Sequence, residues 1–404
     1  MPRNVRMYNA YFGDCFVLED ANIDMNLLVD CGIHRCSKIR GGLRHEDYTR
    51  QILDDIASKY KELNALITHF HYDHISGLTY MFHNSYKPLN IRTAYIPDIW
   101  GSSFVVATSL LEELMVYLRL SRADLPGYVS GTRVGLLDLL GFLCGNVRDI
   151  RFLRRGVTFP QEEYVTLLPD DDVLKRVKKD FEAIDFPIEF RDYYDRITLL
   201  SERIAGFVQQ NLVEFSVDLG VEYEEQIRSF AEEFNGIVDE AIASTSSSTN
   251  GASITRTIKR LNELGNEISI VFQNTKSDQE NVIFTGDADK KDIGRIARLN
   301  DIPLHDNYKY VKIPHHGTKS HFYDFSTNEL KPRLERELEW CLIPSGAVGG
   351  WARKFGKISV DYGPIGNSKL CSNADWCECC LHACIHMPCL SDRYLVEPDL
   401  SIRI

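Results

Sequence analysis

The stretch Thr68-His69-Phe70-His71-Tyr72-Asp73-His74 decides the interpretation of this chain. It directly follows the apolar residues 63–67, whose pattern is typical of a buried strand, so three imidazoles and a carboxylate gather where that strand ends. Imidazole suits Zn, Cu, Fe and Ni, and a carboxylate adds a harder oxygen donor that Mn and Mg also accept. The cluster therefore predicts a divalent metal site, and a polar loop that happens to be rich in histidine is the alternative.

Two later strand-like runs also end in metal-capable side chains. Residues 282–284 lead to Gly286 and Asp287, and residues 310–314 lead to His315 and His316. Loops at strand ends can aim side chains from a rigid scaffold while they admit a substrate. Asp287 by itself would be interpreted as a turn residue after glycine, but together with the first cluster it becomes a candidate ligand.

Several segments of the chain together resemble the metallo-β-lactamase-fold hydrolases, most closely the soluble relatives of the ComEC-type competence nuclease domain. They are residues 9–18 with the Gly13-Asp14 turn, residues 27–32 ending in Asp30-Cys31-Gly32, residues 68–74, residues 266–272 leading to Thr285-Gly286-Asp287, the motif Lys312-Ile313-Pro314-His315-His316-Gly317, and Ser345-Gly346. The resemblance covers roughly residues 1–169 and 264–360. It implies an α/β fold, the four-layer αββα metallo-β-lactamase sandwich, with a strand pair in residues 266–287 before the bridging aspartate.

The resemblance also implies which residues hold two divalent ions, with zinc preferred and manganese as the alternative. His69 and His71 would bind one ion, Asp73, His74 and His316 would bind the other, and Asp287 would bridge them. The nucleophile would be a metal-bound hydroxide, because coordination lowers the pKa of water toward about 7. Asp73 would orient that hydroxide and carry its proton. His315 would contact the substrate or donate a proton to the leaving oxygen, although exchanging the roles of His315 and His316 would leave the reaction class unchanged.

One expected ligand is missing from this pattern. Many members of the superfamily supply a third histidine to the first ion between residues 74 and 287, and the only histidine in that interval is His83, which comes too early in the order. The nuclease-like branch tends to carry an asparagine-containing segment there instead. Asn266 or a water is therefore expected to fill the position.

Three functions remain open at this stage. The first is metal-dependent hydrolysis of a phosphodiester in a nucleic acid or a nucleotide-like molecule. The second is hydrolysis of another ester, a lactone or an amide, since a fold does not determine its substrate. The third is a non-catalytic metal-binding protein that recruits a protein partner.

Composition limits the partners. The 404 residues contain 44% hydrophobic residues and carry a formal net charge of −12, which argues against a long nucleic-acid footprint. The best basic cluster is Arg148, Arg151, Arg154 and Arg155, for which solvation of a strand edge is favoured over phosphate binding. No signal peptide is apparent, and the apolar run at residues 136–144 suits a buried helix rather than a membrane span. We therefore expect a cytoplasmic protein that does not engage a membrane.

The order of elements suggests four segments. Residues 1–169 form the first half of the expected fold, with helices at 45–60 and after 103 and strands at 92–96, 149–153 and 163–168. Residues 170–263 form a helical insertion, expected to be a lid, a docking surface for a protein partner or a passive packing layer, and its last helix is expected to end at a Gly265 cap. Residues 264–370 form the second half.

Residues 371–404 are rich in cysteine. Six of the eleven cysteines lie there with two histidines: Cys371, Cys377, Cys379, Cys380, Cys384 and Cys389, with His382 and His386. This density suits an additional structural zinc, whereas redox-active or simply reduced thiols are the alternatives.

Overall fold

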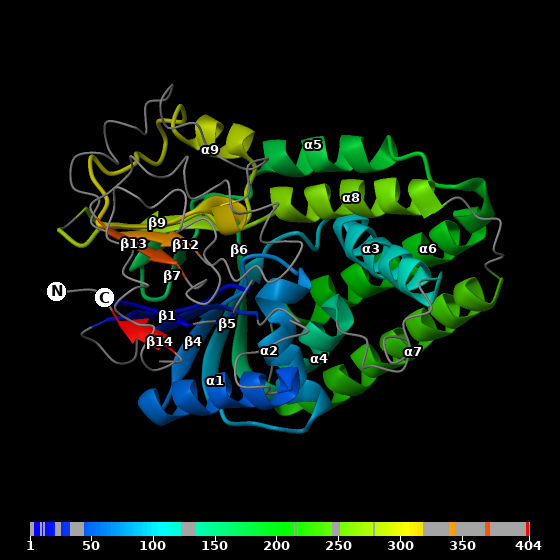
Figure 1. Ribbon diagram of the computed structural model, residues 1–404, viewed down its shortest axis with the longest axis horizontal. Coiled ribbons are helices and arrows are strands. Elements are labelled where there is room, and N and C mark those ends of the chain that lie inside the picture. Colours follow the sequence, from blue (N-terminus) through cyan, green and yellow to red (C-terminus); the bar gives the residue numbers. More distant parts are fainter. Residues whose placement is uncertain are drawn as a thin grey trace.

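The computed structural model describes residues 4–8, 10, 13–20, 26–32, 44–122, 135–213, 215, 217–244, 251–277, 279–317, 340–343, 368–371 and 401–403. Within these residues the protein is a mixed α/β structure with two sheets on one side and a group of long helices on the other (Figure 1). Among the described helices, none combines the length and the apolar character that a membrane crossing requires. The Cys-rich residues beyond Cys371, the Ser345-Gly346 segment and parts of the opening hairpin lie outside the described residues.

The first sheet has the strand order β14-β1-β2-β3-β4-β5-β6. Its strands are β1 (Asn4–Tyr8), β2 (Cys15–Glu19), β3 (Leu27–Cys31), β4 (Leu63–Leu66), β5 (Ile91–Pro97), β6 (Val147–Leu153) and β14 (Ser401–Arg403). Strands β14 to β3 pair antiparallel, whereas β3 to β6 pair parallel. Helices connect the parallel strands, as this arrangement requires. They are α1 (His45–Lys59), α2 (Tyr72–His83), α3 (Ser103–Arg122) and α4 (Leu136–Asn146).

The second sheet has the strand order β13-β12-β11-β10-β9-β8-β7. Its strands are β7 (Thr158–Phe159), β8 (Tyr164–Leu168), β9 (Val271–Asn274), β10 (Val282–Phe284), β11 (Tyr310–Lys312), β12 (Trp340–Ile343) and β13 (Ser368–Cys371). Strands β7 to β10 pair antiparallel and β10 to β13 pair parallel. The short helix α9 (Lys290–Ile296) follows β10.

The two sheets pack face to face through apolar side chains that alternate along the strands. Phe16 of β2 meets Phe284 of β10 with ring centroids 5.4 Å apart, and Phe272 of β9 stacks on Phe284 at 5.2 Å. The intervening Val17 and Ile283 belong instead to the larger apolar cluster that includes the helices. This period of two buries the central strands β2, β3 and β10 on both faces.

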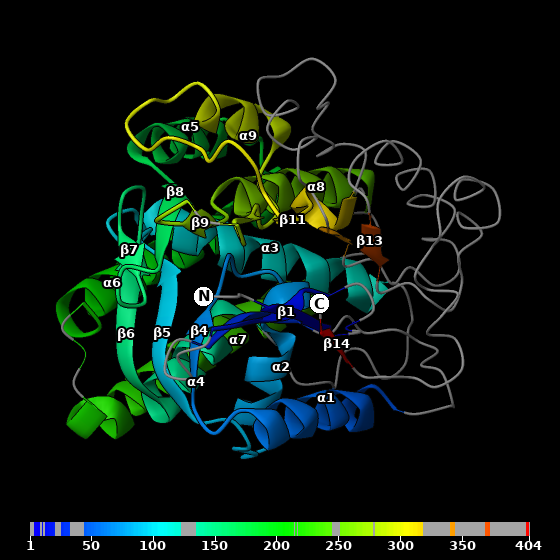
Figure 2. The same ribbon diagram turned by 90° about the vertical axis from the view of Figure 1, so that its left-hand side faces the viewer.

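Four long helices fill the chain between β8 and β9. They are α5 (Asp171–Glu182), α6 (Arg191–Asn211), α7 (Gly220–Ser244) and α8 (Gly251–Glu267), with 3-10 turns at Ile188–Phe190 and Val217–Leu219. Helices α6 and α7 pack against α3 and α4, and α8 lies along α3 (Figures 1 and 2). The apolar stripe of α7 is buried at Ile227, Phe230, Phe234 and Ile237 and partly buried at Ile242. Helix α8 runs through the expected segment boundary at residues 263 and 264.

Two local expectations about the return to the second sheet were wrong. Gly265 does not cap α8 but lies inside it, because the helix continues to Glu267. The strand expected from residue 266 begins only at Val271. Helix α8 persists because its backbone packs against the His71 ring: a Cβ at Gly265 would lie 2.4 Å from His71 Nε2. Glycine is therefore needed there for close approach rather than for a left-handed turn.

Candidate metal centre

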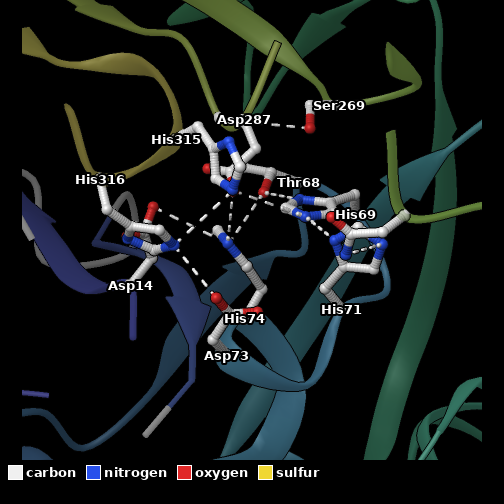
Figure 3. Close-up of polar contacts among 12 residues, drawn as sticks. Asp14, Thr68, His69, His71, Asp73, His74, Ser269, Asp287, His315 and His316 are labelled. Atoms are coloured by element: carbon white, nitrogen blue, oxygen red, sulfur yellow. Dashed lines mark hydrogen bonds and ion pairs between the residues drawn. The ribbon is translucent and has the colours of Figure 1, made fainter. Parts of the chain in front are cut away.

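The metal-capable side chains predicted from the sequence meet where strands of both sheets end (Figure 3). The loop after β4 and the first turn of α2 carry His69, His71, Asp73 and His74. Asp287 follows β10, and His315 and His316 follow β11 in a short turn. The site thus joins the first sheet to the second.

The first group of candidate ligand atoms comprises ring nitrogens of His69 and His71. His69 Nε2 lies 3.0 Å from His71 Nδ1 and 4.0 Å from Asp287 Oδ2. Two nitrogens on one tetrahedral zinc ion would lie about 3.3 Å apart, so the imidazole pair has the spacing of two ligands to one ion.

The second group comprises ring nitrogens of His74 and His316, which also lie near Asp287 Oδ2, together with the Asp73 carboxylate. His74 Nε2 lies 3.4 Å and His316 Nε2 lies 3.6 Å from Asp287 Oδ2. His316 Nε2 is also 3.1 Å from Asp73 Oδ2. Asp287 Oδ2 therefore lies within 4.0 Å of a histidine nitrogen from each group, and the ligand atoms of His69, His74 and Asp287 lie within 4.8 Å of one another.

Each of the four histidines in these two groups contacts an outer partner through its other ring nitrogen. His69 Nδ1 contacts Thr68 Oγ1 at 3.1 Å, and His71 Nε2 contacts Glu112 Oε2 at 3.2 Å. His74 Nδ1 contacts Asp30 Oδ2 at 2.8 Å, and His316 Nδ1 contacts Asp14 Oδ1 at 3.1 Å. Metal-binding histidines typically have such an outer partner, which selects the tautomer and orients the ring.

Asp30 also anchors the loop that carries the first histidines. The Thr68 backbone N–H donates to Asp30 Oδ1, and the Thr68 hydroxyl donates to Asp30 Oδ2, each at 2.7 Å. Asp30 adopts a left-handed backbone conformation with φ of 53°, and His315 and His316 do so with φ of 47° and 52°. Such conformations cost about 1 to 3 kcal/mol each and concentrate at functional sites.

A buried lysine contacts the other oxygen of the Asp287 carboxylate. Lys312 Nζ lies 2.5 Å from Asp14 Oδ2 and 3.3 Å from Asp287 Oδ1, and it donates to the Gly286 carbonyl at 2.7 Å. Lys312 therefore engages Asp287 Oδ1 and leaves Oδ2 facing the histidines. Asp14 likewise contacts Lys312 Nζ and His316 Nδ1, so it supports the candidate ligands. Asp14 also lies close enough to His74 and His316 to form a candidate metal-binding group with them.

Glycine permits the hairpin of the first sheet to reach the site. A Cβ at Gly32 would lie 1.6 Å from the Asp73 carbonyl oxygen, and one at Gly13 would lie 2.3 Å from the Gly32 carbonyl oxygen. The Asp14 N–H donates to that Asp73 carbonyl at 2.9 Å. The Gly-Asp and Asp-Cys-Gly segments thus hold Asp14 and Asp30 against the start of α2.

The ionisation of the site reflects its burial and its crowded charges. Burial lowers the pKa of His74 and of His316, but Asp287 and the other nearby carboxylates outweigh it, so the pKa of His74 lies well above its ordinary value and that of His316 rises to about 9. Burial and the neighbouring His74 and His71 hold the pKa of His69 well below its ordinary value. The pKa of Asp287 is lowered despite burial, because His74, His316 and Lys312 stabilise its charge. Binding of cations must therefore displace protons.

The buried polar atoms fit a pair of divalent ions. His74 Nε2 is buried and makes no hydrogen bond to a described residue, and the same holds for both side-chain polar atoms of Asn266. Unpaired buried polar groups are costly unless a ligand or ion satisfies them. The groups around His74 are imidazole nitrogens and carboxylates, which suit zinc or manganese.

The structure thus brings together all six expected ligands, and His315 with them: its Nε2 lies 3.7 Å from Asp287 Oδ2. His83 is elsewhere, 3.2 Å from Asp138 of α4. Sequence reasoning gave no role to Asp14, Asp30, Glu112 or Lys312. Asp14 and Asp30 lie in the Gly13-Asp14 and Asp30-Cys31-Gly32 segments of the opening hairpin. Glu112 is distinguished in the sequence only as a polar residue on an amphipathic helix.

Comparisons with known proteins do not assign the site. No protein-family model matches the chain, and no curated protein matches it in a sequence search.

Proposed function

We propose that this protein is a binuclear metallohydrolase of the metallo-β-lactamase fold, with its two sheets and outer helices as the four-layer αββα sandwich, and that it cleaves phosphodiesters. The observation that carries the proposal is that Nε2 atoms of His69, His74 and His316 lie 4.0, 3.4 and 3.6 Å from Asp287 Oδ2, while each of these rings has an outer partner at its other nitrogen. His69, His71 and Asp287 would hold one ion, and the side chain of Asn266, whose buried polar atoms make no hydrogen bond to a described residue, would complete its ligands. Asp73, His74, His316 and Asp287 would hold the second.

When bound, the two ions would supply positive charge and lower the pKa of a water, so that a nucleophile exists at neutral pH. The protein's own residues orient the reaction. The Asp73 and His315 side chains are 20% and 19% exposed, whereas those of His69, His74, Asp287 and His316 are at most 2% exposed. The His71 side chain is 14% exposed, so Asp73 and His315 are the most exposed of these residues and we expect substrate to reach the centre past them.

Their chemistry suits the two proton transfers that hydrolysis needs. Asp73 accepts the proton of the attacking water, and His315 donates a proton to the leaving oxygen. His315 stands at the exposed rim beside Asp287 Oδ2, so it can reach a bond that is broken over the centre.

Charge favours a short anionic substrate over a long nucleic-acid footprint. The arginines of the candidate basic cluster are already paired with carboxylates: Arg148 with Glu62, Arg151 with Asp149, Arg154 with Asp98 and Arg155 with Asp301. Little of that cluster is left to track a polyanion. The ions themselves would provide the charge that attracts a phosphodiester.

The test combines metal content with hydrolysis of a substrate panel: bis(p-nitrophenyl) phosphate, dinucleotides, cyclic dinucleotides, and an ester, a lactone and a β-lactam. We expect about two ions per chain and phosphodiester cleavage that is lost in Asp73→Ala and His71→Ala while both variants stay folded. His83→Ala is the matched control, because the His83 ring pairs with Asp138 on α4. We expect this variant to keep both its metal content and its phosphodiesterase activity. Cleavage of only the non-phosphate substrates would show that the enzyme acts on an ester, lactone or amide instead. Full activity of both site variants would refute the proposal.

A further inference from the structure

We propose that Glu112 of α3 and Asn262 of α8 form a positioning pair that sets the tautomer and orientation of His71 for the first ion. This inference rests on the metal centre proposed above, and it assigns part of that centre to the helical segment between the two sheets.

The contacts form a closed set of three side chains. Glu112 Oε2 lies 3.2 Å from His71 Nε2, and Asn262 Nδ2 donates to Glu112 Oε1 at 3.1 Å. Asn262 Nδ2 also lies 3.5 Å from His71 Nε2. Both oxygens of Glu112 are thus engaged, one by the imidazole and one by the amide, which holds the carboxylate in a single orientation.

This arrangement leaves only one nitrogen of His71 for an ion. The Nε2 side of the ring is closed by Glu112 and by the α8 backbone, since a Cβ at Gly265 would lie 2.4 Å from that atom. With Nε2 donating its proton to the carboxylate, Nδ1 carries the free lone pair. Nδ1 is the atom that faces His69 Nε2 at 3.0 Å. A hydrogen bond at one ring nitrogen therefore prepares the other as a ligand.

The two helices that supply the pair come from distant parts of the chain. Helix α3 lies between β5 and β6 of the first sheet, whereas α8 ends the helical segment that precedes β9. They pack along each other beside the centre (Figure 2). The helical segment is therefore more than a packing layer, because the position of α8 decides how firmly Glu112 and His71 are held.

The experiment measures metal affinity directly, with Co²⁺ and Zn²⁺ alone as probes and a chromophoric chelator as competitor. For Glu112→Ala we expect the affinity for one of the two ions to fall about 10- to 100-fold, with a changed visible absorption of the bound Co²⁺, because the ring loses its orienting partner. Glu112→Gln keeps an acceptor oxygen for His71 and is expected to recover part of the loss. Asn262→Ala is expected to give a smaller loss in the same ion.

Two controls separate positioning from a purely structural ion pair. Glu263→Gln changes the residue next to Asn262, whose carboxylate pairs with Arg260 on the surface of α8, and should bind both ions as the wild type does. In a His71→Ala background, adding Glu112→Ala should cause no further loss of affinity, because the carboxylate acts through His71. A structural role would lower the stability of both backgrounds equally and leave the affinity unchanged.

The outcomes distinguish this inference from the proposed function. If the wild type binds no ion, the metal centre itself is wrong. If the wild type binds two ions and Glu112→Ala and Glu112→Gln bind both with unchanged affinity and unchanged Co²⁺ absorption, the metal centre stands and the positioning role is refuted. Should Glu112→Ala fail to fold, Glu112→Gln and Asn262→Ala decide the question by the same titration.

Discussion

Replacing the buried lysine with methionine, Lys312→Met, tests how charge is balanced in the centre. In the ion-free protein Lys312 is the fixed cation between Asp14 and Asp287, and the side chains of all three residues are at most 2% exposed. Removing one partner of a buried ionic group costs about 3 to 5 kcal/mol, and we expect the lower end of that range here because protonated His74 and His316 remain beside both carboxylates. With two divalent ions bound, cations remain beside Asp287, so the cost should fall to about 1 to 2 kcal/mol, the value of the lost hydrogen bond to Gly286.

The assay is urea unfolding of wild type and variant, once with a chelator and once with saturating Zn²⁺. The thermodynamic cycle then requires the variant to bind the ions more tightly than the wild type, which a competition titration checks independently. Lys309→Met is the control, because Lys309 pairs with Glu280 nearer the surface and should cost about 1 kcal/mol or less in both conditions. An equal loss of stability with and without Zn²⁺ would show that the ions do not share the lysine's carboxylates.

The remaining predictions concern the outer partner of His74, the hairpin glycine and a buried thiol. Asp30→Asn places an N–H against His74 Nδ1 and forces the ring proton onto Nε2, so the affinity for one ion should fall about 10- to 100-fold in a Zn²⁺ titration; unchanged binding would contradict Nε2 as the ligand atom. Gly32→Ala should destabilise the protein by about 3 kcal/mol in urea unfolding, because the new Cβ would overlap the Asp73 carbonyl; wild-type stability would refute the close approach. Burial raises the pKa of the Cys144 thiol from 9.0 to about 12, so the stability from keeping it neutral is present below pH 9 and is lost as pH rises from 9 toward 12. The urea stability of wild type relative to Cys144→Ala should therefore decline over that range, and a constant difference would argue against the shift.

Most elements could be predicted from local patterns, because each carries its own periodicity. Tyr48, Ile52, Leu53 and Ile56 recur at helical spacing, and all four are buried on one face of α1. Strands β4, β10 and β11, which end directly before the metal-capable residues, likewise begin and end within a residue or two of the expected positions. A local apolar pattern is sufficient to predict a helix or strand that buries one of its own faces.

The features that escaped prediction depend on contacts between distant segments. Gly265 has the local pattern of a helix cap, but the helix continues because the glycine admits the His71 ring from far away in the chain. Glu112 stands beside Glu113 on α3, and nothing local distinguishes the carboxylate that orients a histidine from the one that accepts a hydrogen bond from the Leu136 N–H. Only the packing of α3 against α8 makes that difference.

The antiparallel pairing of β8 with β9 has a consequence for how this protein can change. Thr166 pairs with Phe272 and Leu168 with Val271, so the chain leaves the second sheet and rejoins it on neighbouring strands. Helices α5 to α8 therefore stand where a hairpin loop would otherwise connect these two strands. Loop closure entropy grows only slowly with length, by about 0.6 kcal/mol for each doubling, so the length of this segment has by itself little effect on the pairing of β8 with β9. The helix whose last turns reach the histidines is α8, whereas α6 and α7 can change only as far as their packing against α3 and α4 allows.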